Sequence, residues 1–266
     1  MPELPEVQTI VNGLKKIVLG KKIFSLDEFR KGTIQNFVSE NIPELGIIIS
    51  IKRRGKYIII ETSNDYKLII HLRMTGKLIY ESSPEKISSH ERANFIFEDN
   101  KKLIFDDTRA FGKIHIYKKD DKVKALEKLG LEPFSENFNE KYLKKIFKTR
   151  KSPIKNLLLN QNIVAGLGNI YTNEILFRAK VSPITKGNKL TLEKLKTIVE
   201  HTREVLKEAI KYNGTTISDY RSVEDKTGEF QNFLNVYHKE YCKCGHQIKR
   251  IKQAGRSTYY CPVCQK

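Results

Sequence analysis

Four cysteines near the C-terminus are the residues most clearly suited to chemistry. They form two close pairs, Cys242 with Cys244 and Cys261 with Cys264. The second pair has the two-residue spacing usual for zinc ligands, whereas the first pair is one residue shorter. Disulfides are disfavoured in a reducing cytosol, and thiolates bind zinc well. The pairs therefore predict a β-hairpin zinc finger that holds one structural Zn²⁺ ion.

A second candidate site is the segment Gly166-Leu-Gly168-Asn169, which lies between two predicted helices. Glycine turns of this kind bring backbone N–H groups to a helix start, where a phosphate can bind. An ordinary helix–turn–helix hairpin explains the same pattern equally well. The sequence leaves both interpretations open.

The charge balance favours an anionic partner. Lys and Arg number 49 against 31 Asp and Glu, which gives a net charge of +18. Such an excess attracts polyanions, including nucleic acid. A general lysine bias of the organism would also raise the charge. The chain shows no apolar run long enough to span a bilayer and no secretory signal, so we expect a cytoplasmic protein without a membrane partner.

Hydrophobic patterning predicts the elements that position these residues. Helical spacing of apolar residues predicts a helix over 5–19. Short β-rich runs separated by turns such as 63–65 and 98–100 predict an antiparallel sandwich between about 22 and 118. Examples of these runs are 46–51, 57–61, 67–71, 94–97, 102–105 and 113–117.

The second half of the chain is predicted to be helical. Helices are expected at 142–147, 153–160 and 170–179. A longer helix is capped by Thr191, runs to Tyr212 and stops at Asn213-Gly214. We therefore divide the chain into a β-rich N-terminal domain (1–118), a linker (119–135), a helical domain (136–235) and a finger (236–266).

Motifs along the whole chain resemble the formamidopyrimidine-DNA glycosylase family. The resemblance is carried by Met1-Pro-Glu-Leu-Pro-Glu-Val7, Arg54-Gly-Lys-Tyr57, His71-Leu-Arg-Met74, Asp107-Thr-Arg-Ala-Phe-Gly112, Gly166-Leu-Gly-Asn-Ile-Tyr171, Gly214-Thr-Thr-Ile-Ser-Asp219 and Gly255-Arg-Ser-Thr-Tyr-Tyr-Cys-Pro-Val-Cys-Gln265. It implies an α+β fold with an N-terminal helix, a β-sandwich, a helix–two-turns–helix domain with a lesion loop near 214–228, and the finger. It also implies a monomeric bacterial enzyme that excises 8-oxoguanine and formamidopyrimidines from damaged duplex DNA and then cuts the strand.

The resemblance assigns catalytic roles to four residues. Removal of Met1 would leave Pro2 with a free secondary amine, which can attack the sugar C1′ and form a cationic iminium ion. Glu3 is implied to donate a proton to the deoxyribose ring oxygen. Glu6 is either the neighbour that raises the pKa of Glu3 or an acid favoured at a helix start. Lys56 is implied to contact the damaged nucleotide, and Arg256 at the finger tip to grip the DNA around the lesion.

The same resemblance predicts six DNA contacts. Met74, Arg109 and Phe111 match the residues that fill the space left by a flipped nucleotide. His71, Lys155 and Asn169 are implied to hold phosphates, together with Arg256.

The chain departs from the family at the first cysteine pair, which is Cys-x-x-Cys in relatives. Either the hairpin accommodates Cys242 and Cys244, or His238 or His246 replaces one ligand. Asn160, where the family usually has Asp, is a smaller departure. Two rival functions are an endonuclease VIII-like enzyme for oxidised pyrimidines and a non-catalytic zinc-ribbon protein that binds DNA or RNA.

Overall fold

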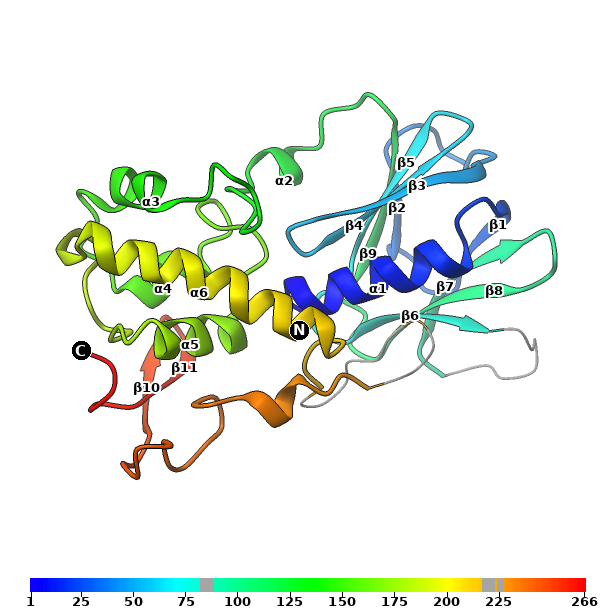
Figure 1. Cartoon of the computed structure of the whole chain (residues 1–266). Helices are drawn as coiled ribbons and strands as arrows, with labels where there is room; N and C mark the ends of the chain where they lie inside the picture. Colours follow the sequence, from blue (N-terminus) through cyan, green and yellow to red (C-terminus); the bar gives the residue numbers. More distant parts are fainter. Residues whose placement is uncertain (82–88, 217–222, 224–226) are drawn as a thin grey trace. The chain divides into compact units, whose positions relative to one another are not determined.

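The computed structural model describes residues 1–81, 89–216, 223 and 227–266, and its chain divides into two units (Figure 1). Unit 1 contains Met1–Val123 and Tyr212–Glu229, and unit 2 contains Lys124–Lys211 and Phe230–Lys266. Most of the predicted lesion loop near 214–228 lies outside the described residues. Within the described ranges, no helix is long and apolar enough to cross a membrane.

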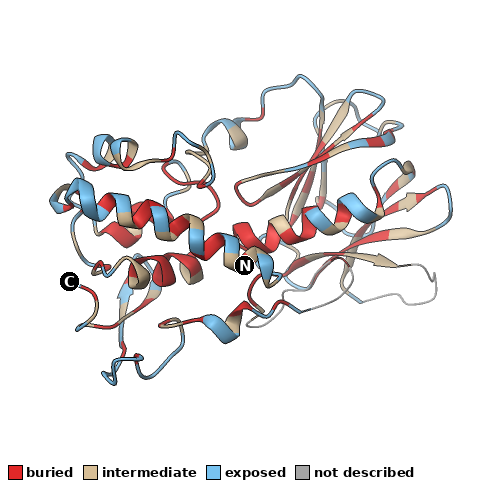
Figure 2. Cartoon of the chain, in the orientation of Figure 1, coloured by how far each residue is buried: buried red, intermediate tan, exposed pale blue. Residues whose placement is uncertain are grey.

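Unit 1 begins with helix α1 (Leu4–Ile17), whose Pro5 lies in the first turn. The apolar residues that predicted this helix, among them Val7, Ile10 and Leu14, form its buried face (Figure 2). The strands follow as β1 (Lys22–Glu28), β2 (Ile34–Asn36), β3 (Gly46–Arg54), β4 (Tyr57–Thr62), β5 (Tyr66–His71), β6 (Gly76–Glu81), β7 (Glu91–Phe97), β8 (Lys102–Asp107) and β9 (Lys113–Lys118).

These strands make a β-sandwich, as the sequence predicted. They are hydrogen-bonded in the order β2-β9-β5-β4-β3-β1-β7-β8-β6, and the short pairing of β1 with β3 connects the two layers. All pairings are antiparallel except that of β2 with β9, which is parallel. The core lies between the layers and α1, and its largest side chains include Phe95, Phe97 and Phe105.

Unit 2 is helical, with a two-stranded hairpin near its C-terminus. Its helices are α2 (Lys124–Glu127), α3 (Glu140–Phe147), α4 (Ile154–Leu159), α5 (Asn169–Arg178) and α6 (Leu192–Lys211). Short 3-10 turns occupy Gly187–Lys189 and Phe230–Phe233, and strands β10 (Lys249–Gln253) and β11 (Arg256–Tyr260) form the hairpin. Helices α3 and α5 both pack against α6.

The predicted start and end signals of α6 are confirmed in detail. The hydroxyl of Thr191 accepts the backbone N–H of Lys194 at 3.2 Å, as an N-cap does. Asn213 and Gly214 both have positive φ, 59° and 81°, which is the left-handed conformation that ends helices. Tyr212–Glu229 then belongs with unit 1. Its backbone is hydrogen-bonded to that unit; for example, the carbonyl oxygen of Val223 accepts the N–H of Tyr80 at 3.1 Å.

Candidate functional site

The start of α1 buries two carboxyl groups next to the predicted nucleophile. Pro2 is buried, and Glu3 and Glu6 are 3% and 2% exposed. The backbone N–H of Glu3 donates to Glu6 Oε2 at 2.7 Å, and the two residues form a reciprocal capping box. The helix-start role that the sequence allowed for Glu6 is therefore present in the structure.

Glu6 also binds the chain that returns from α6. Its Oε1 accepts the backbone N–H of Thr215 at 2.8 Å. Gly214 is required at this point, because a Cβ there would lie 2.7 Å from Glu6 Oε1 and the residue has positive φ. The hydroxyl of Thr216 accepts the N–H of Gly228 at 2.7 Å. Glu6 thus ties the first turn of α1 to the start of the predicted lesion loop, and Thr216 ties that start to Gly228 near the end of the loop. Residue types alone gave no signal for this contact.

Lys56 lies in the tight turn between β3 and β4 and is 6% exposed. Arg53 holds this turn beside α1. Its Nε donates to Gln8 Oε1 at 2.9 Å, and its Nη1 donates to the carbonyl oxygen of Gly55 at 3.0 Å. The ammonium group of Lys56 is therefore presented from a turn that is fixed to the second turn of α1.

His71 ends β5 and is held as a neutral imidazole. Its Nδ1 accepts the backbone N–H of Arg73 at 2.9 Å, so the ring proton belongs on Nε2. Burial lowers its pKa from 6.5 to about 3, and the positive charges of Arg73 and Lys56 contribute to the decrease. His71 can consequently offer a neutral N–H donor to a phosphate at physiological pH.

Met74, Arg109 and Phe111 are all exposed on loops of unit 1. Met74 is 41% exposed in the turn before β6, which confirms that it does not belong to the core. Phe111 is 52% exposed in the loop after β8, and the guanidinium carbon of Arg109 lies 4.9 Å from the centre of its ring. An apolar side chain, an aromatic ring and a cation therefore all face solvent from these two loops.

The C-terminal hairpin presents Arg256 at its tip. Ala254 and Gly255 form the two-residue connection with φ values of 45° and 76°, as in the type I′ turns that join tight hairpins. Arg256 follows directly and is exposed.

The structure uses Lys155 and Asn169 to hold this hairpin. Lys155 is fully buried, and its Nζ donates to the carbonyl oxygen of Ser257 at 2.9 Å and to the hydroxyl of Thr258 at 2.7 Å. Asn169 Nδ2 donates to the same Ser257 carbonyl at 3.0 Å. Both side chains thus fix the backbone next to Arg256, and their contacts with phosphate stay predictions.

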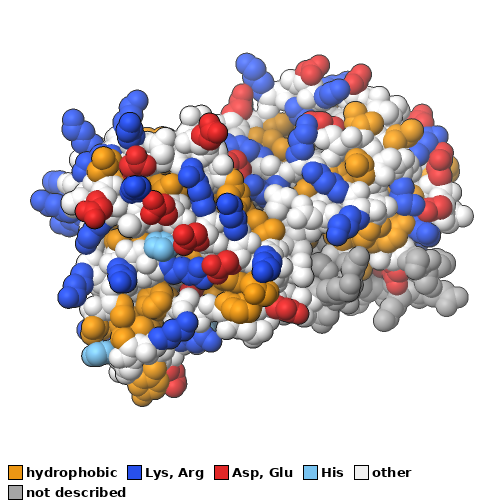
Figure 3. All heavy atoms as spheres, viewed as in Figure 1, with side chains coloured by type: hydrophobic (Ala, Val, Ile, Leu, Met, Phe, Trp, Pro, Cys, Tyr) orange, Lys and Arg blue, Asp and Glu red, His pale blue; other side chains and the backbone are white. Residues whose placement is uncertain are grey.

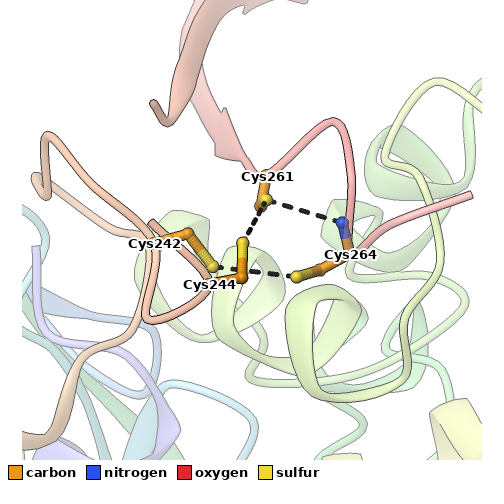
Figure 4. A group of neighbouring side chains, drawn as sticks. All are labelled: Cys242, Cys244, Cys261 and Cys264. Carbon is orange, nitrogen blue, oxygen red and sulfur yellow. Dashed lines mark hydrogen bonds between the residues drawn. The ribbon is translucent and has the colours of Figure 1, made fainter. Parts of the chain in front are cut away.

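The four cysteines converge between the loop before β10 and the turn after β11 (Figure 4). Their sulfur atoms all lie within 4.8 Å of one another, and the cysteines are free thiols. Cys242 Sγ is 3.8 Å from Cys264 Sγ, and Cys244 Sγ is 3.6 Å from Cys261 Sγ. Tetrahedral zinc with Zn–S distances of about 2.3 Å separates its sulfurs by about 3.8 Å. The donor set therefore fits a zinc ion, and the short first pair is accommodated.

The two histidines proposed as substitute ligands differ in their surroundings. His238 Nε2 is 3.3 Å from the hydroxyl of Tyr259 and its ring packs on that of Tyr237. His246 is exposed, and its Nδ1 lies 3.5 Å from Cys244 Sγ. Its backbone N–H is the largest of several hydrogen-bond contributions that lower the pKa of the Cys244 thiol to about 6. Neither histidine belongs to the group of converging side chains found among the described residues.

Three family models match successive parts of the chain. They are the formamidopyrimidine-DNA glycosylase N-terminal domain over residues 1–114, the H2TH domain of the same enzymes over 129–221, and a zinc finger found in FPG and IleRS over 242–266.

Individual relatives match the full length. The formamidopyrimidine-DNA glycosylase of Wolbachia sp. subsp. Brugia malayi (strain TRS) is 39% identical over 276 residues, with complete coverage of both chains. A Lactococcus lactis FPG mutant in complex with a Fapy-dG containing DNA superposes with a TM-score of 0.91 at 37% identity, again with 100% of each chain covered. The structure of MutM with carbocyclic 8-oxo-G containing DNA gives 0.91 at 38% identity and the same coverage.

The sandwich, the helical unit and the four-cysteine finger together define a DNA glycosylase of DNA repair. The chain belongs to the formamidopyrimidine-DNA glycosylase family.

Proposed function

We propose that the protein excises oxidised purines from duplex DNA through a covalent adduct at Pro2 and then cleaves the strand by β,δ-elimination. The observation that carries this proposal is the buried start of α1, where Pro2 and Glu3 adjoin a carboxylate held by two backbone N–H groups. The relatives that match the whole chain bear the corresponding enzyme name.

The reaction requires that Met1 is removed, because an amide nitrogen cannot attack carbon. The amine of Pro2 then forms a bond to C1′ of the damaged nucleotide while the bond from C1′ to the base breaks. The departing base takes a proton, and opening of the sugar yields an iminium ion. A secondary amine has no neutral imine form, so the positive charge stays on nitrogen. It draws electrons from the C2′–H bond as the 3′-phosphate leaves, and then, through the new C2′–C3′ double bond, from the C4′–H bond as the 5′-phosphate leaves.

Glu3 and Lys56 supply the proton transfers in this scheme. Glu3 protonates the ring oxygen as the sugar opens, which is a suitable role for a carboxyl group beside the nucleophile. Lys56 contacts the damaged nucleotide from the turn that Arg53 fixes to α1.

Residues of both units hold the DNA. His71, Asn169 and Arg256 bind phosphates around the lesion, and the buried Lys155 fixes the backbone next to Arg256. Met74, Arg109 and Phe111 enter the stack as the nucleotide flips out. The protein acts as a monomer on damaged chromosomal DNA in the bacterial cytoplasm.

One structural zinc ion is bound by Cys242, Cys244, Cys261 and Cys264. When bound, it supplies a rigid tetrahedral cross-link between the two cysteine pairs and no step of the reaction. Its effect on function is to fix the hairpin that presents Arg256.

Borohydride trapping tests the proposal directly. The full-length protein, with removal of Met1 verified by intact mass, is incubated with 8-oxoguanine duplex and sodium borohydride. We expect a covalent protein–DNA product whose modified peptide contains Pro2. Pro2→Gly should still bind the duplex but trap far less, because a less constrained primary amine replaces the secondary one. An adduct on Lys56 instead, or wild-type trapping by Pro2→Gly, would remove Pro2 from the mechanism.

The same assay separates the rival functions. A non-catalytic zinc-ribbon protein gives no adduct, and the full-length matches to glycosylases already argue against it. An endonuclease VIII-like enzyme would trap oxidised pyrimidines in preference to 8-oxoguanine.

A further inference from the structure

We propose that Asp107 is a positioning residue that locks the loop of Met74 to the loop of Arg109 and Phe111, so that both enter DNA as one rigid wedge. This inference rests on the proposed function, which assigns these three side chains to the DNA stack. It concerns a buried carboxyl group that touches neither DNA nor the reacting atoms.

Asp107 connects the two loops through both carboxyl oxygens. Its Oδ1 accepts the hydroxyl of Thr75, the neighbour of Met74. The same oxygen accepts the backbone N–H of Arg109 at 3.3 Å, and Oδ2 accepts that of Gly112 at 2.7 Å. The hydroxyl of Thr75 completes the connection by accepting the N–H of Arg109 at 3.0 Å. The backbone on either side of Ala110 and Phe111 is therefore fixed to the turn that carries Met74.

The strand framework places this carboxyl group at the junction. Asp107 ends β8 and is paired with Gly76 at the start of β6, so the two loops leave neighbouring strands at the same level. Its own backbone is held on both sides, with its N–H bound to His90 O at 2.9 Å and its carbonyl oxygen to Arg92 Nε at 2.8 Å. Asp107 is fully buried, whereas Met74 and Phe111 are exposed.

Both loops also have backbone conformations that need external support. Arg73 and Ala110 have positive φ values of 54° and 52°, which are unfavourable for residues with a side chain. A Cβ on Gly112 would lie 2.4 Å from the ring of Phe105 and 3.1 Å from Asp107 Oδ2, so the loop passes too close to accept one. Hydrogen bonds donated by the loop N–H groups to a buried carboxylate can hold such a loop in place in the absence of DNA.

Rigidity matters for this wedge because a flipped base tends to restack. Extrusion costs a few kcal/mol, and the wedge offsets this cost only if little ordering entropy is lost as it inserts. Freeing either loop should therefore slow reactions that require extrusion from a paired duplex. It should affect far less the cleavage of an abasic site in single-stranded DNA, where no base is extruded.

The test compares these two substrates in single-turnover experiments with the full-length protein. Asp107→Asn leaves one acceptor oxygen and turns an amide NH2 toward a donor, and Thr75→Val removes the hydroxyl at nearly constant volume. For each variant we expect at least about a tenfold slower excision of 8-oxoguanine paired with cytosine, with a much smaller change on the single-stranded abasic site. A 2-aminopurine placed beside the lesion should report slower unstacking by the same factor.

Two control variants isolate the proposed contact. Thr75→Ser keeps the hydroxyl and should keep the wild-type ratio of the two rates. Asp99→Asn makes the same chemical change as Asp107→Asn at an exposed ion pair with Lys21, and should also leave the ratio unchanged.

The outcomes separate failure of the inference from failure of the proposed function. Inactivity of the wild-type protein on both substrates would reject the proposed function. An active wild type, with both variants losing the two activities equally or losing neither, would reject the positioning role of Asp107. If Asp107→Asn does not fold, Thr75→Val carries the same comparison.

Discussion

At the scale of single residues, burial and one backbone hydrogen bond decide what His71 can offer to DNA. The backbone N–H of Arg73 donates to Nδ1 of His71. The ring also lies near three groups that disfavour a positive charge on it, namely Arg73, Lys56 and His115. Protonation would add a further cation to this group. The side chain is therefore a directed neutral donor, in contrast to the exposed guanidinium of Arg256.

The lowered pKa of His71 makes unfolding stability depend on pH. The folded pKa of about 3 is below the ordinary 6.5, so between these values the unfolded chain binds a proton that the folded chain does not. The contribution of His71 is complete above about pH 6.5 and is lost as the pH falls toward about 3. His71→Gln should reduce this part of the slope in urea unfolding measurements made at several pH values. The slope should not vanish, because burial also lowers the pKa of His115.

His201→Gln is the matched control for this prediction. His201 lies on α6, in the other unit, and is partly exposed beside Glu204. The His201→Gln variant should therefore leave the pH dependence of the unfolding stability of unit 1 unchanged. An identical slope in the wild type and His71→Gln would show that His71 is protonated equally in both states.

At the scale of elements, local sequence patterns predicted the turns and the helix ends, because these features depend on residues close together in the chain. The turns 63–65 and 98–100 are confirmed by positive φ at Asp65 and Asn100. The five predicted helices start and end within two residues of the predicted positions, whereas the short α2 lies in the predicted linker and was not foreseen. Strands β1, β2 and β6 were not singled out, because β1 and β6 mix charged and apolar residues and β2 is three residues long. The parallel pairing of β2 with β9 was likewise not indicated by the local sequence pattern.

Contacts between distant segments explain the rest of what sequence patterns missed. Asp107 meets Thr75 only because β6 and β8 pair in one register. Burial of Lys155 depends on Thr258, more than a hundred positions further along the chain. The residue type indicates only that a lysine is able to bind a phosphate. It does not indicate that the ammonium group of Lys155 donates a hydrogen bond to the hairpin carbonyl of Ser257.

The finger is an element whose small core includes its own ligands. Cys242 and Cys261 are buried with Val236, Ile248 and Tyr259, and Phe177 of α5 packs against this cluster. Because this core contains so few apolar side chains, it stabilises the loops of the finger only weakly in the absence of a cross-link. The core of the sandwich does not include these residues.

Removal of zinc should therefore loosen residues 236–266 while the remaining structure persists. We expect about one zinc per chain in the purified protein, and chelation should increase hydrogen exchange chiefly in this segment and weaken binding to abasic DNA. Cys242→Ser should lower zinc content and affinity together. His246→Ala is the matched control and should retain the metal. Loss of zinc in His246→Ala but not in Cys242→Ser would overturn the four-cysteine ligand set.

At the scale of the whole molecule, the net charge is +18. Figure 3 shows Lys and Arg side chains over the visible face of both units, interspersed with Asp and Glu. Several are neutralised locally, such as Lys22 by Glu98 at 3.1 Å and Arg178 by Glu208 at 2.7 Å. A cation paired in this way adds little to phosphate binding, so the number of phosphates neutralised is set by the cations that face the DNA.

Salt dependence of DNA binding measures that number. Each neutralised phosphate contributes about −0.9 to the slope of log K against log salt on duplex DNA. We expect a steep slope for the wild type, and a reduction of about one unit for Arg256→Ala, since its exposed guanidinium can replace a counterion. Lys22→Ala, which removes a cation already paired with Glu98, should leave the slope unchanged.

Lys155→Met should weaken binding by releasing the Ser257 carbonyl, but with little change of slope, because its ammonium group is buried within the protein. A reduction of about one unit for Lys155→Met would instead assign this lysine to a phosphate, and a flat wild-type plot would contradict the phosphate contacts altogether.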